Sequence, residues 1–425
     1  MNARNPSRFV QSRARDTAAS LLMLTVPFVA IAPANAQSVL EAITGGTALL
    51  DVRLRYDHVE QSDKQNDADA STIRARAGYR TGSYFGFAAL AEFDVVQHLG
   101  PRNFNDTVNQ HTNFPSVADP DMATLNRLQL EYDARVFTSP SRPPDARIVA
   151  GRQEIVIGNQ RFVGNAAWRQ HEQTFDAVSL SETLLPDLTL FYAYVNRVNR
   201  VFGPQNPLGH FDGDTHLFDV VYAGLRHLRL EGYAYWYDFR NAPTLSTENA
   251  GVRATASFDL GDGLTAALDG EYAHQTNRAS NPLMISLGDY RTEARLTSGA
   301  LSTTIGYEVS EGNGRIGFQT PLVSGHLFQG WAEMFVVKPA DGLKDFYAKA
   351  SYSFLGPLAI RIAPSLAYHD FSAERVKAYY GGEWDYGVEA QLDAHLTANI
   401  AYASYSGAGP FPDKRELWVY ATYHL

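Results

Sequence analysis

The sequence predicts an all-β fold, a transmembrane antiparallel up-and-down β-barrel of about 18 strands. Three observations lead to this prediction: an export signal at the start, about a dozen segments in which apolar and polar residues alternate, and no apolar stretch long enough for a bilayer-spanning helix. The last segment is typical, because Leu417, Val419, Tyr423 and Leu425 are separated by even numbers of residues. This period places their side chains on one face of a strand.

Residues 1–36 have the three parts of a secretory signal peptide. A basic start contains Arg4, Arg8, Arg13 and Arg15, an apolar core covers 21–32, and a small-residue cleavage site is formed by Ala34, Asn35 and Ala36. The apolar core is about 12 residues long, shorter than the roughly 20 that a membrane-spanning helix needs, so we expect cleavage rather than anchoring. The predicted mature chain, 37–425, is then a single outer-membrane barrel.

Composition excludes several classes of function. The signal carries a charge of +3, so its removal from a chain of formal charge −10 leaves about −13, which argues against nucleic acid as a partner. Cysteine is absent, which excludes thiol catalysis and disulfides. The 12 histidines lack metal-ligand spacing, and neither a serine-hydrolase elbow nor a phosphate-binding loop occurs. We therefore predict that the protein is not an enzyme and uses no metal or cofactor.

Four segments show the strand pattern clearly. Apolar side chains should face lipid and polar side chains a wet lumen. The predicted lipid-facing sets are Ile73, Ala75, Ala77 and Tyr79; Val252, Ala254, Ala256 and Phe258; Phe346, Ala348, Ala350, Tyr352 and Phe354; and Trp384, Tyr386, Val388, Ala390 and Leu392. A soluble β-sandwich would also alternate. Alanine in the middle of these segments, with aromatic residues near the ends, favours the barrel, since aromatic girdles mark both membrane interfaces.

Short turns and long polar stretches separate the segments. Tight turns are predicted at 186–187, 261–263 and 356–357, and such turns face the periplasm in outer-membrane barrels. The predicted outer loops are 98–121, 158–172, 201–214, 276–288, 311–326 and 370–382. The stretch 158–171 has two interpretations, a constriction folded into the lumen or an ordinary exposed loop.

Two blocks of sequence resemble the alginate-export family of outer-membrane channels. The first has GRQE at 151–154, GNQRFVG at 158–164, Trp168 and TFDAV at 174–178; the second has GYE at 306–308, FQTPL at 318–322, His326, Phe328, GWAEMF at 330–335 and PADGL at 339–343. The resemblance implies a monomeric barrel with an arginine-rich constriction that passes an anionic polysaccharide. Asn159 and Gln173 depart from the Asp and Arg of the family pattern.

Arginine is the candidate selectivity element, because guanidinium stays charged and binds carboxylates through two hydrogen bonds. The strand pattern also places Arg53, Arg55 and Arg80 toward the lumen. The predicted pore-lining, anion-selecting set is Arg74, Arg76, Arg152, Glu154, Arg161, Arg169, Arg253, Arg291, Arg295 and Arg361. The alternative is that these arginines pair with neighbours and hold the wall in shape; the partners would be Glu92, Glu131, Asp133, Glu154, Asp259 and Glu293.

Three further clusters each have two explanations. The acidic residues Glu383, Asp385, Glu389 and Asp393 either form one wall of a transverse field or neutralise neighbouring arginines. Tyr233, Tyr235 and Tyr237, with Trp236 on the opposite face, either stack on sugar rings or belong to a girdle. The pairs Asp119/Asp121 and Asp212/Asp214 either bind a hard cation or are solvated loop carboxylates.

The function predicted from these observations is an outer-membrane channel that passes an anionic, alginate-like poly- or oligosaccharide by passive diffusion through an arginine-rich constriction. The first alternative is an uptake porin for small anionic nutrients. The second is a barrel-wall hydrolase, since a Ser/His pair has no fixed spacing in sequence. The expected partners are the polysaccharide and outer-membrane lipid but not nucleic acid; we expect a monomer, with room for periplasmic export or uptake partners.

Overall fold

The computed structural model describes residues 36–134 and 145–425, so the predicted signal peptide lies outside the described residues apart from Ala36. The strands within them are β1 (Thr47–Gln61), β2 (Ala68–Arg80), β3 (Phe87–His98), β4 (Met122–Asp133), β5 (Asp145–Gln153), β6 (Thr174–Leu185), β7 (Leu188–Asn199), β8 (His210–Leu225), β9 (Leu228–Trp236), β10 (Thr247–Gly261), β11 (Leu264–Asn277), β12 (Ser286–Ser298), β13 (Leu301–Ser310), β14 (Leu343–Tyr352), β15 (Phe354–Leu355), β16 (Arg361–Ser372), β17 (Tyr379–Gln391), β18 (Leu396–Gly407) and β19 (Lys414–His424). The helices are α1 (Val39–Thr44) and the 3-10 turns η2 (Pro243–Leu245), η3 (Gly325–Leu327) and η4 (Pro357–Ala359). None of the described helices has the length and apolar character needed to cross a bilayer.

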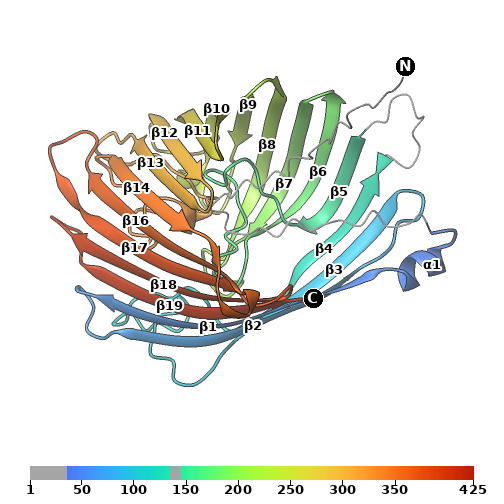
Figure 1. The fold of residues 1–425 in the computed structure, drawn as a ribbon, viewed down its shortest axis with the longest axis horizontal. Coiled ribbons are helices and arrows are strands. Elements are labelled where there is room, and N and C mark those ends of the chain that lie inside the picture. Colours follow the sequence, from blue (N-terminus) through green and yellow to red (C-terminus); the bar gives the residue numbers. More distant parts are fainter. Residues whose placement is uncertain (1–35, 135–144) are drawn as a thin grey trace, which may run out of the picture.

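The strands form one closed antiparallel sheet. Each strand pairs with its neighbour in sequence, and β19 pairs with β1 along an eleven-residue register from Asp51↔His424 to Gln61↔Lys414. The two residues of β15 continue β14, since both strands pair with β16. The predicted up-and-down barrel of 18 strands is therefore confirmed for the described residues (Figure 1).

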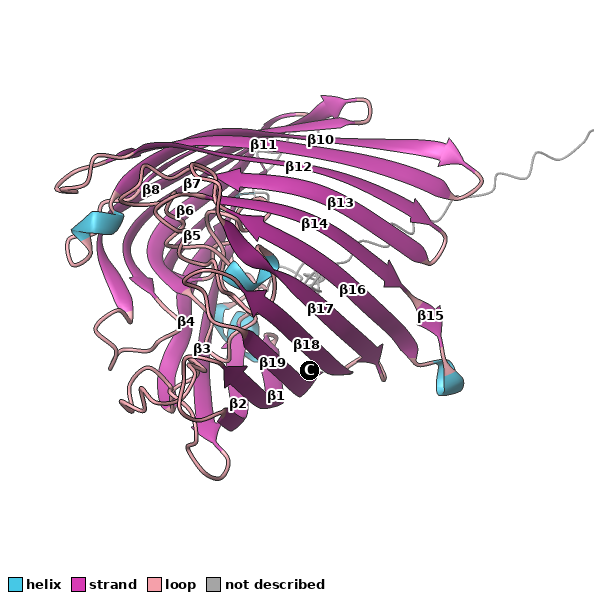
Figure 2. Cartoon of the chain, turned by 90° about the vertical axis from the view of Figure 1, so that its left-hand side faces the viewer, coloured by secondary structure: helices cyan, strands magenta, loops and turns pink. Residues whose placement is uncertain are grey.

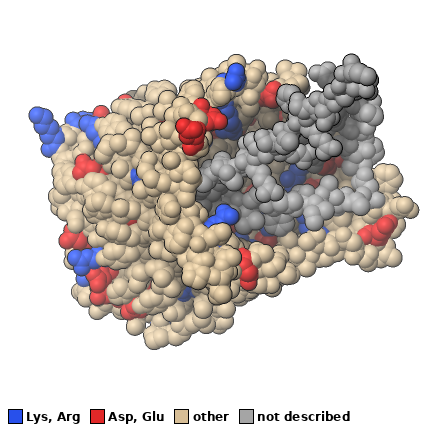
Figure 3. Space-filling model, viewed as in Figure 1, with Lys and Arg blue, Asp and Glu red and all other residues tan. Residues whose placement is uncertain are grey.

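The outer surface of the barrel is apolar. All four predicted lipid-facing sets point outward; for example Val252 is 61% exposed and Phe346 is 44% exposed. Exposed aromatic residues lie toward both ends of the strands, with Tyr79, Phe258, Tyr352 and Tyr423 near one end and Tyr272, Tyr290, Tyr307 and Trp384 near the other. Most of the described surface seen in Figure 3 carries no charged side chain. Such a band, on a barrel without free edges, is a surface for lipid, and it places the protein in an outer membrane.

Short turns and long loops lie at opposite ends of the barrel (Figure 2). The turns at 186–187, 261–263 and 356–357 are at one end, where α1 and the C-terminus also lie. The long connections lie at the other end, but some predicted bounds were wrong. The loop predicted at 201–214 ends where β8 begins at His210, and the loop predicted at 370–382 shortens to 373–378 because β17 begins at Tyr379. The loop that begins at 311 continues to 342, and the connections 62–67, 237–246 and 408–413 were not predicted.

The orientation of side chains on β18, toward lipid or toward the lumen, gives a direct test of this architecture. Ile400 is 54% exposed on the outer face, and the adjacent Asn399 lines the interior. Ile400→Arg should lower the free energy of unfolding in phospholipid vesicles by roughly 2–4 kcal/mol, since a cation at the lipid-facing midplane is costly. Asn399→Arg, one residue away, should change it far less. Equal losses for both variants, measured by reversible denaturant titration, would contradict the assigned facing.

Candidate functional site

Two long loops fold into the lumen and pack against each other. The first lumen loop covers 154–173, between β5 and β6, and the second covers 311–342, between β13 and β14. Gly164 N donates to Leu322 O at 2.9 Å. Ser324 Oγ accepts from Ala166 N at 3.0 Å and donates to Gln160 Oε1 at 2.8 Å. The two blocks of family resemblance are therefore neighbours in space, although about 150 residues separate them in sequence.

The first lumen loop is anchored to opposite walls of the barrel. On one side Arg161 lies 2.9 Å from Asp289 of β12 and 2.6 Å from Glu308 of β13, with its side chain 2% exposed. On the other side, Arg55 of β1 donates to Trp168 O at 2.7 Å, and His171 Nδ1 lies 3.1 Å from Asp94 of β3. Because β1 to β3 and β12 to β13 face each other in the ring of strands, this loop spans the lumen (Figure 1).

An apolar core lies beneath the Arg161 side of this loop. Its buried members include Ile155, Ile157, Phe162 and Val163 from the loop, Tyr233 and Tyr235 from β9, and Tyr237 and Phe239 from the connection after β9. The three tyrosine rings stack in a row, with centroids 4.9 and 6.4 Å apart. The girdle interpretation is wrong for these tyrosines, because they point inward, and their burial under the loop also removes them from contact with a solute.

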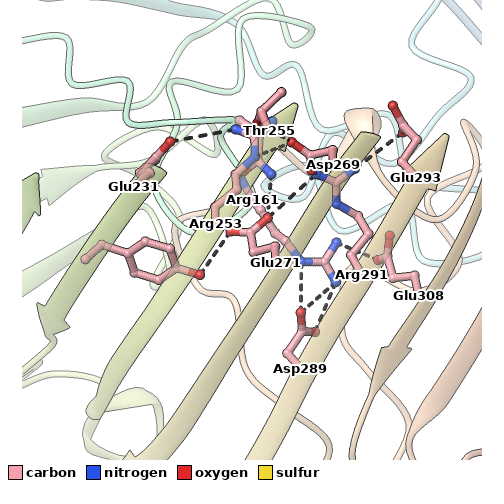
Figure 4. A network of polar contacts seen from close by, with 12 residues as sticks. Arg161, Glu231, Arg253, Thr255, Asp269, Glu271, Asp289, Arg291, Glu293 and Glu308 are labelled. Carbon is pink, nitrogen blue, oxygen red and sulfur yellow. Dashed lines mark hydrogen bonds and ion pairs between the residues drawn. The ribbon is translucent and has the colours of Figure 1, made fainter. Parts of the chain in front are cut away.

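Arginines and carboxylates alternate along the wall from β9 to β13 (Figure 4). Arg253 Nε lies 2.8 Å from Asp269 and Arg295 Nη2 lies 2.9 Å from Glu293. Arg291, between them, contacts Asp269 and both Glu271 and Glu293. These three members of the predicted set are thus paired within the wall, as the alternative held, although only Glu293 among their partners was predicted. Their charges are largely compensated.

A second network joins β2 to β4 and the first lumen loop. Arg76 lies 3.2 Å from both Asp94 and Glu172. Arg74 contacts Asp51 and is buried. Glu154 begins the loop and accepts from Asn165 Nδ2. Burial, assisted by the nearby Glu172 carboxylate, raises the pKa of Glu154 to about 7.

Arg152 does not face the lumen. In an antiparallel sheet, directly paired residues share a face. Arg152 is paired with Leu128, which is 53% exposed on the lipid side, and with Asp176, whose carboxylate lies 2.7 Å from Arg152 Nε. The prediction that Arg152 lines the pore is therefore wrong. Arg152 was assigned from the resemblance block, which gives no strand register. The pairings of β5 with β4 and β6 run through Gly151 without a shift, so Arg152 shares the outer face with the exposed Ile148.

The two positions that depart from the family pattern support the loop. Asn159 Nδ2 donates to Glu271 Oε2 at 2.7 Å, and Asn159 Oδ1 accepts from Arg161 N at 3.0 Å. Gln173 Nε2 donates to Gly164 O at 2.7 Å. Both amides hold the loop in place and add no net charge.

The acidic clusters agree only in part with the explanations drawn from the sequence. Glu383 and Asp385 are fully buried, and no arginine lies within 4 Å of either among the described residues; instead Glu383 Oε1 accepts from Ala332 N at 2.7 Å. Asp119 is fully buried and accepts from Gln170 N at 2.9 Å, so it is not a solvated loop carboxylate. Asp212 and Asp214 contact Arg197 and Arg240. No grouping of metal ligands occurs in the described part of the chain.

A passage of about 620 Å³ remains beside the two lumen loops. At the long-loop end it is lined by Arg200 and Phe202, and at the short-turn end by His395 and His424. Between the two ends it is lined by residues that include Arg53, Trp168, Arg169, His326, Glu333, Lys338, Glu389 and Tyr420. Lining residues from both ends of the barrel indicate a continuous route along the lumen.

Cations outnumber free carboxylates along this passage. Arg53, Arg200 and Lys338 have no carboxylate within 4 Å among the described residues, whereas Arg169, the member of the predicted set that lines the cavity, pairs with Glu333. Glu389 is a lining carboxylate without a described ion pair.

Arg53 faces the lumen as the strand pattern predicts, although the predicted selecting set does not include it. Lys338 and Arg200 were not predicted as lining residues. Lys338 could have been suspected from its position directly before the PADGL run at 339–343.

The middle of the passage is rigidly packed. The rings of Trp168 and His326 stack with centroids 3.5 Å apart, and Arg55 lies 4.7 Å over the Trp168 ring. Burial lowers the pKa of His326 to about 4, so this imidazole is neutral at physiological pH. Arg361, the last of the predicted set, is exposed at the short-turn end of β16.

Solved structures share this fold. No family model and no curated protein matches the sequence. OpdL of Pseudomonas aeruginosa is 16% identical with a TM-score of 0.65, covering 90% of this chain and 99% of its own. OccAB2 of Acinetobacter baumannii is 13% identical with a TM-score of 0.67, covering 91% and 99%. OpdK of P. aeruginosa, solved with vanillate, is 13% identical with a TM-score of 0.65, covering 89% and 98%.

These structures are outer-membrane porins of 18 strands, which are channels rather than enzymes. Identities this low establish the barrel fold and not a shared substrate. The likeness to the alginate-export family remains a resemblance of sequence. The described residues also give little to the hydrolase alternative: Ser286 Oγ and His274 Nε2 are 3.4 Å apart on the exposed rim, and no carboxylate or amide orients this imidazole.

Removing the Arg161 anchor should loosen the constriction. Arg161→Gln leaves Asp289 and Glu308 buried without their cation, which is strongly unfavourable. We expect larger and noisier single-channel conductance in planar bilayers. Arg152→Gln is the matched control, since it removes an arginine of the outer face, and its conductance should equal that of the native protein. If the conductance and current noise of Arg161→Gln equal those of the native protein, the loop does not need the Arg161 ion pairs to hold its position.

Lys338 should make anion preference depend on pH. Burial, together with the nearby Arg161 charge, lowers the pKa of Lys338 to about 8. The ammonium is therefore charged below this pH and neutral above it, so anion preference should fall as pH rises through about 8. Reversal potentials in a salt gradient, measured on both sides of that pH, test this. Lys338→Met should abolish the step, and Lys377→Met, in the exposed loop 373–378, should preserve it.

Proposed function

We propose that this protein is a passive outer-membrane channel for small anionic solutes, chiefly organic carboxylates. The observation that carries the proposal is the uncompensated positive charge of Arg53, Arg200 and Lys338 along the passage. A guanidinium in a narrow route attracts carboxylates and repels cations. Arg53 Nη1 also donates to Ala167 O at 3.1 Å, so the side chain is held in position rather than collapsed onto a carboxylate.

The size of the passage favours a small solute over a polysaccharide. A volume of about 620 Å³ lies within the range of roughly 300–1,000 Å³ that is typical of small-molecule sites. Both lumen loops are tied to the wall, and a polymer would need them to withdraw. OpdK, a neighbour in fold, was solved with vanillate, a small carboxylate, which supports the same class of solute here.

Transport through such a route needs no cofactor and has no built-in direction. The solute gradient across the membrane sets the net flow, so uptake follows wherever the solute is consumed inside the cell. Polysaccharide export remains a second candidate because of the two resemblance blocks, which form the constriction itself. An export channel of this kind would have to open the lumen loops.

Flux measurements separate the two candidates. Proteoliposomes should swell rapidly in small mono- and dicarboxylates and slowly in oligouronates or in cationic solutes of equal size. Arg53→Gln should reduce carboxylate flux and anion preference, most clearly at low salt, since ions screen charge beyond about 10 Å at 0.1 M. Arg152→Gln should leave both unchanged. Equal rates for carboxylates and oligouronates would contradict the proposal.

A further inference from the structure

Helix α1 has no part in the channel, yet it is held firmly against the barrel. Gly82 N donates to Ala42 O at 2.8 Å, and Gly46 N donates to the Tyr79 hydroxyl at 2.9 Å. The same hydroxyl donates to Ile43 O. The Ser38 side chain caps the helix by accepting from Glu41 N at 3.1 Å.

These contacts place α1 at the outer rim, at the short-turn end. Tyr79 is 37% exposed on the lipid-facing side of β2, in the row of Ala75 and Ala77, whereas Arg80 faces inward toward Glu131. A helix bonded to the Tyr79 hydroxyl therefore lies beside the lipid-facing surface and not over the lumen (Figure 1).

The link to the barrel leaves the helix little freedom. Only Gly45 and Gly46 separate α1 from β1. A Cβ at Gly46 would lie 2.4 Å from Arg80 O, so the backbone packs tightly against the end of β2. The apolar face of α1 is consequently fixed in direction.

No other described part of the protein covers the apolar face of α1. Val39, Leu40 and Ile43 are 56%, 69% and 51% exposed, and Glu41 is the helix's charged residue. Phe85 in the adjoining turn and Phe87 of β3 are also exposed, and they continue the apolar surface toward the barrel band. Covering three large side chains in water would need a partner, and the nearest apolar phase is the membrane that surrounds the band.

We propose that α1 is an interfacial anchor, whose Val39, Leu40 and Ile43 enter the phospholipid leaflet around the short-turn end. Short turns face the periplasm in outer-membrane barrels, so this is the inner leaflet. Interfacial helices bury an apolar face at the boundary between headgroups and acyl chains and keep charged residues in water. Glu41, with its carboxylate accepting from Gln37 N at 2.7 Å, stays on the water side.

The absence of cysteine allows a direct test on the full folded protein. Leu40→Cys is labelled with an environment-sensitive fluorophore in vesicles of phosphatidylethanolamine and phosphatidylglycerol. Nitroxide near the top of the acyl chains should quench it strongly, deep nitroxide less, and aqueous iodide weakly. Two references calibrate depth: Ile400→Cys in the barrel midplane and Gln65→Cys in the exposed β1–β2 loop.

A second variant separates lipid from protein as the partner. Leu40→Asp with Ile43→Asp, labelled at Val39→Cys, should keep the heat-modifiable migration of a folded barrel but lose nitroxide quenching and gain iodide quenching. Glu41→Gln with the same label should behave as the native helix does. Iodide access to Leu40→Cys in a folded barrel would overturn the proposal. Protection of Leu40→Cys from iodide only at high protein density, together with cross-linked dimers, would also overturn the proposal. That result would identify a second copy of the protein as the partner of the apolar face.

Discussion

The buried contact of Arg161 with Asp289 and Glu308 is the interaction on which the interior of this barrel depends. A closed sheet satisfies its own backbone, but its lumen would be a wide water-filled tube without further structure. One guanidinium, supplied by a loop and bound by two strands, converts that tube into a narrow passage. The cost of burying three charged groups is offset only while all remain together, so the loop has one favourable position.

Different arginines stabilise the barrel wall and line the passage. Most arginines of the wall, such as Arg253, Arg291 and Arg295, are bound to carboxylates and keep the strands in register. The field felt by a solute comes from the few cations without such partners, of which Arg53 lies at the middle of the route. Counting arginines therefore overstates the charge of the pore, since pairing cancels most of it.

The barrel could be predicted from sequence because a strand between lipid and a wet lumen has apolar side chains at every second position. Val252 and Phe346 occupy such positions, and both are exposed on the outer face. The interior could not be predicted to the same extent. Whether Arg161 is free or paired depends on Asp289 and Glu308, more than a hundred residues away, and no local pattern encodes that contact. The lumen-facing orientation predicted for Arg152 was wrong because the resemblance that suggested it carries no strand register, and both faces of β5 mix apolar and polar residues. The girdle interpretation of Tyr233, Tyr235 and Tyr237 was wrong because tyrosines buried beneath a lumen loop show the same alternation in sequence as girdle tyrosines.

Hydrogen exchange of the protein in lipid vesicles tests the central claim most directly, that both lumen loops are folded parts of the channel. Amides such as Gly164, Gln170 and Ala332 donate to partners within the lumen, so peptides from 154–173 and 311–342 should be protected nearly as well as the strands. The exposed connection 62–67, in which Asp63, Gln65 and Asp67 donate no described backbone hydrogen bond, should exchange quickly and serves as the reference. Exchange of the lumen loops at the rate of 62–67 would mean that the passage is open and unstructured, which contradicts the account.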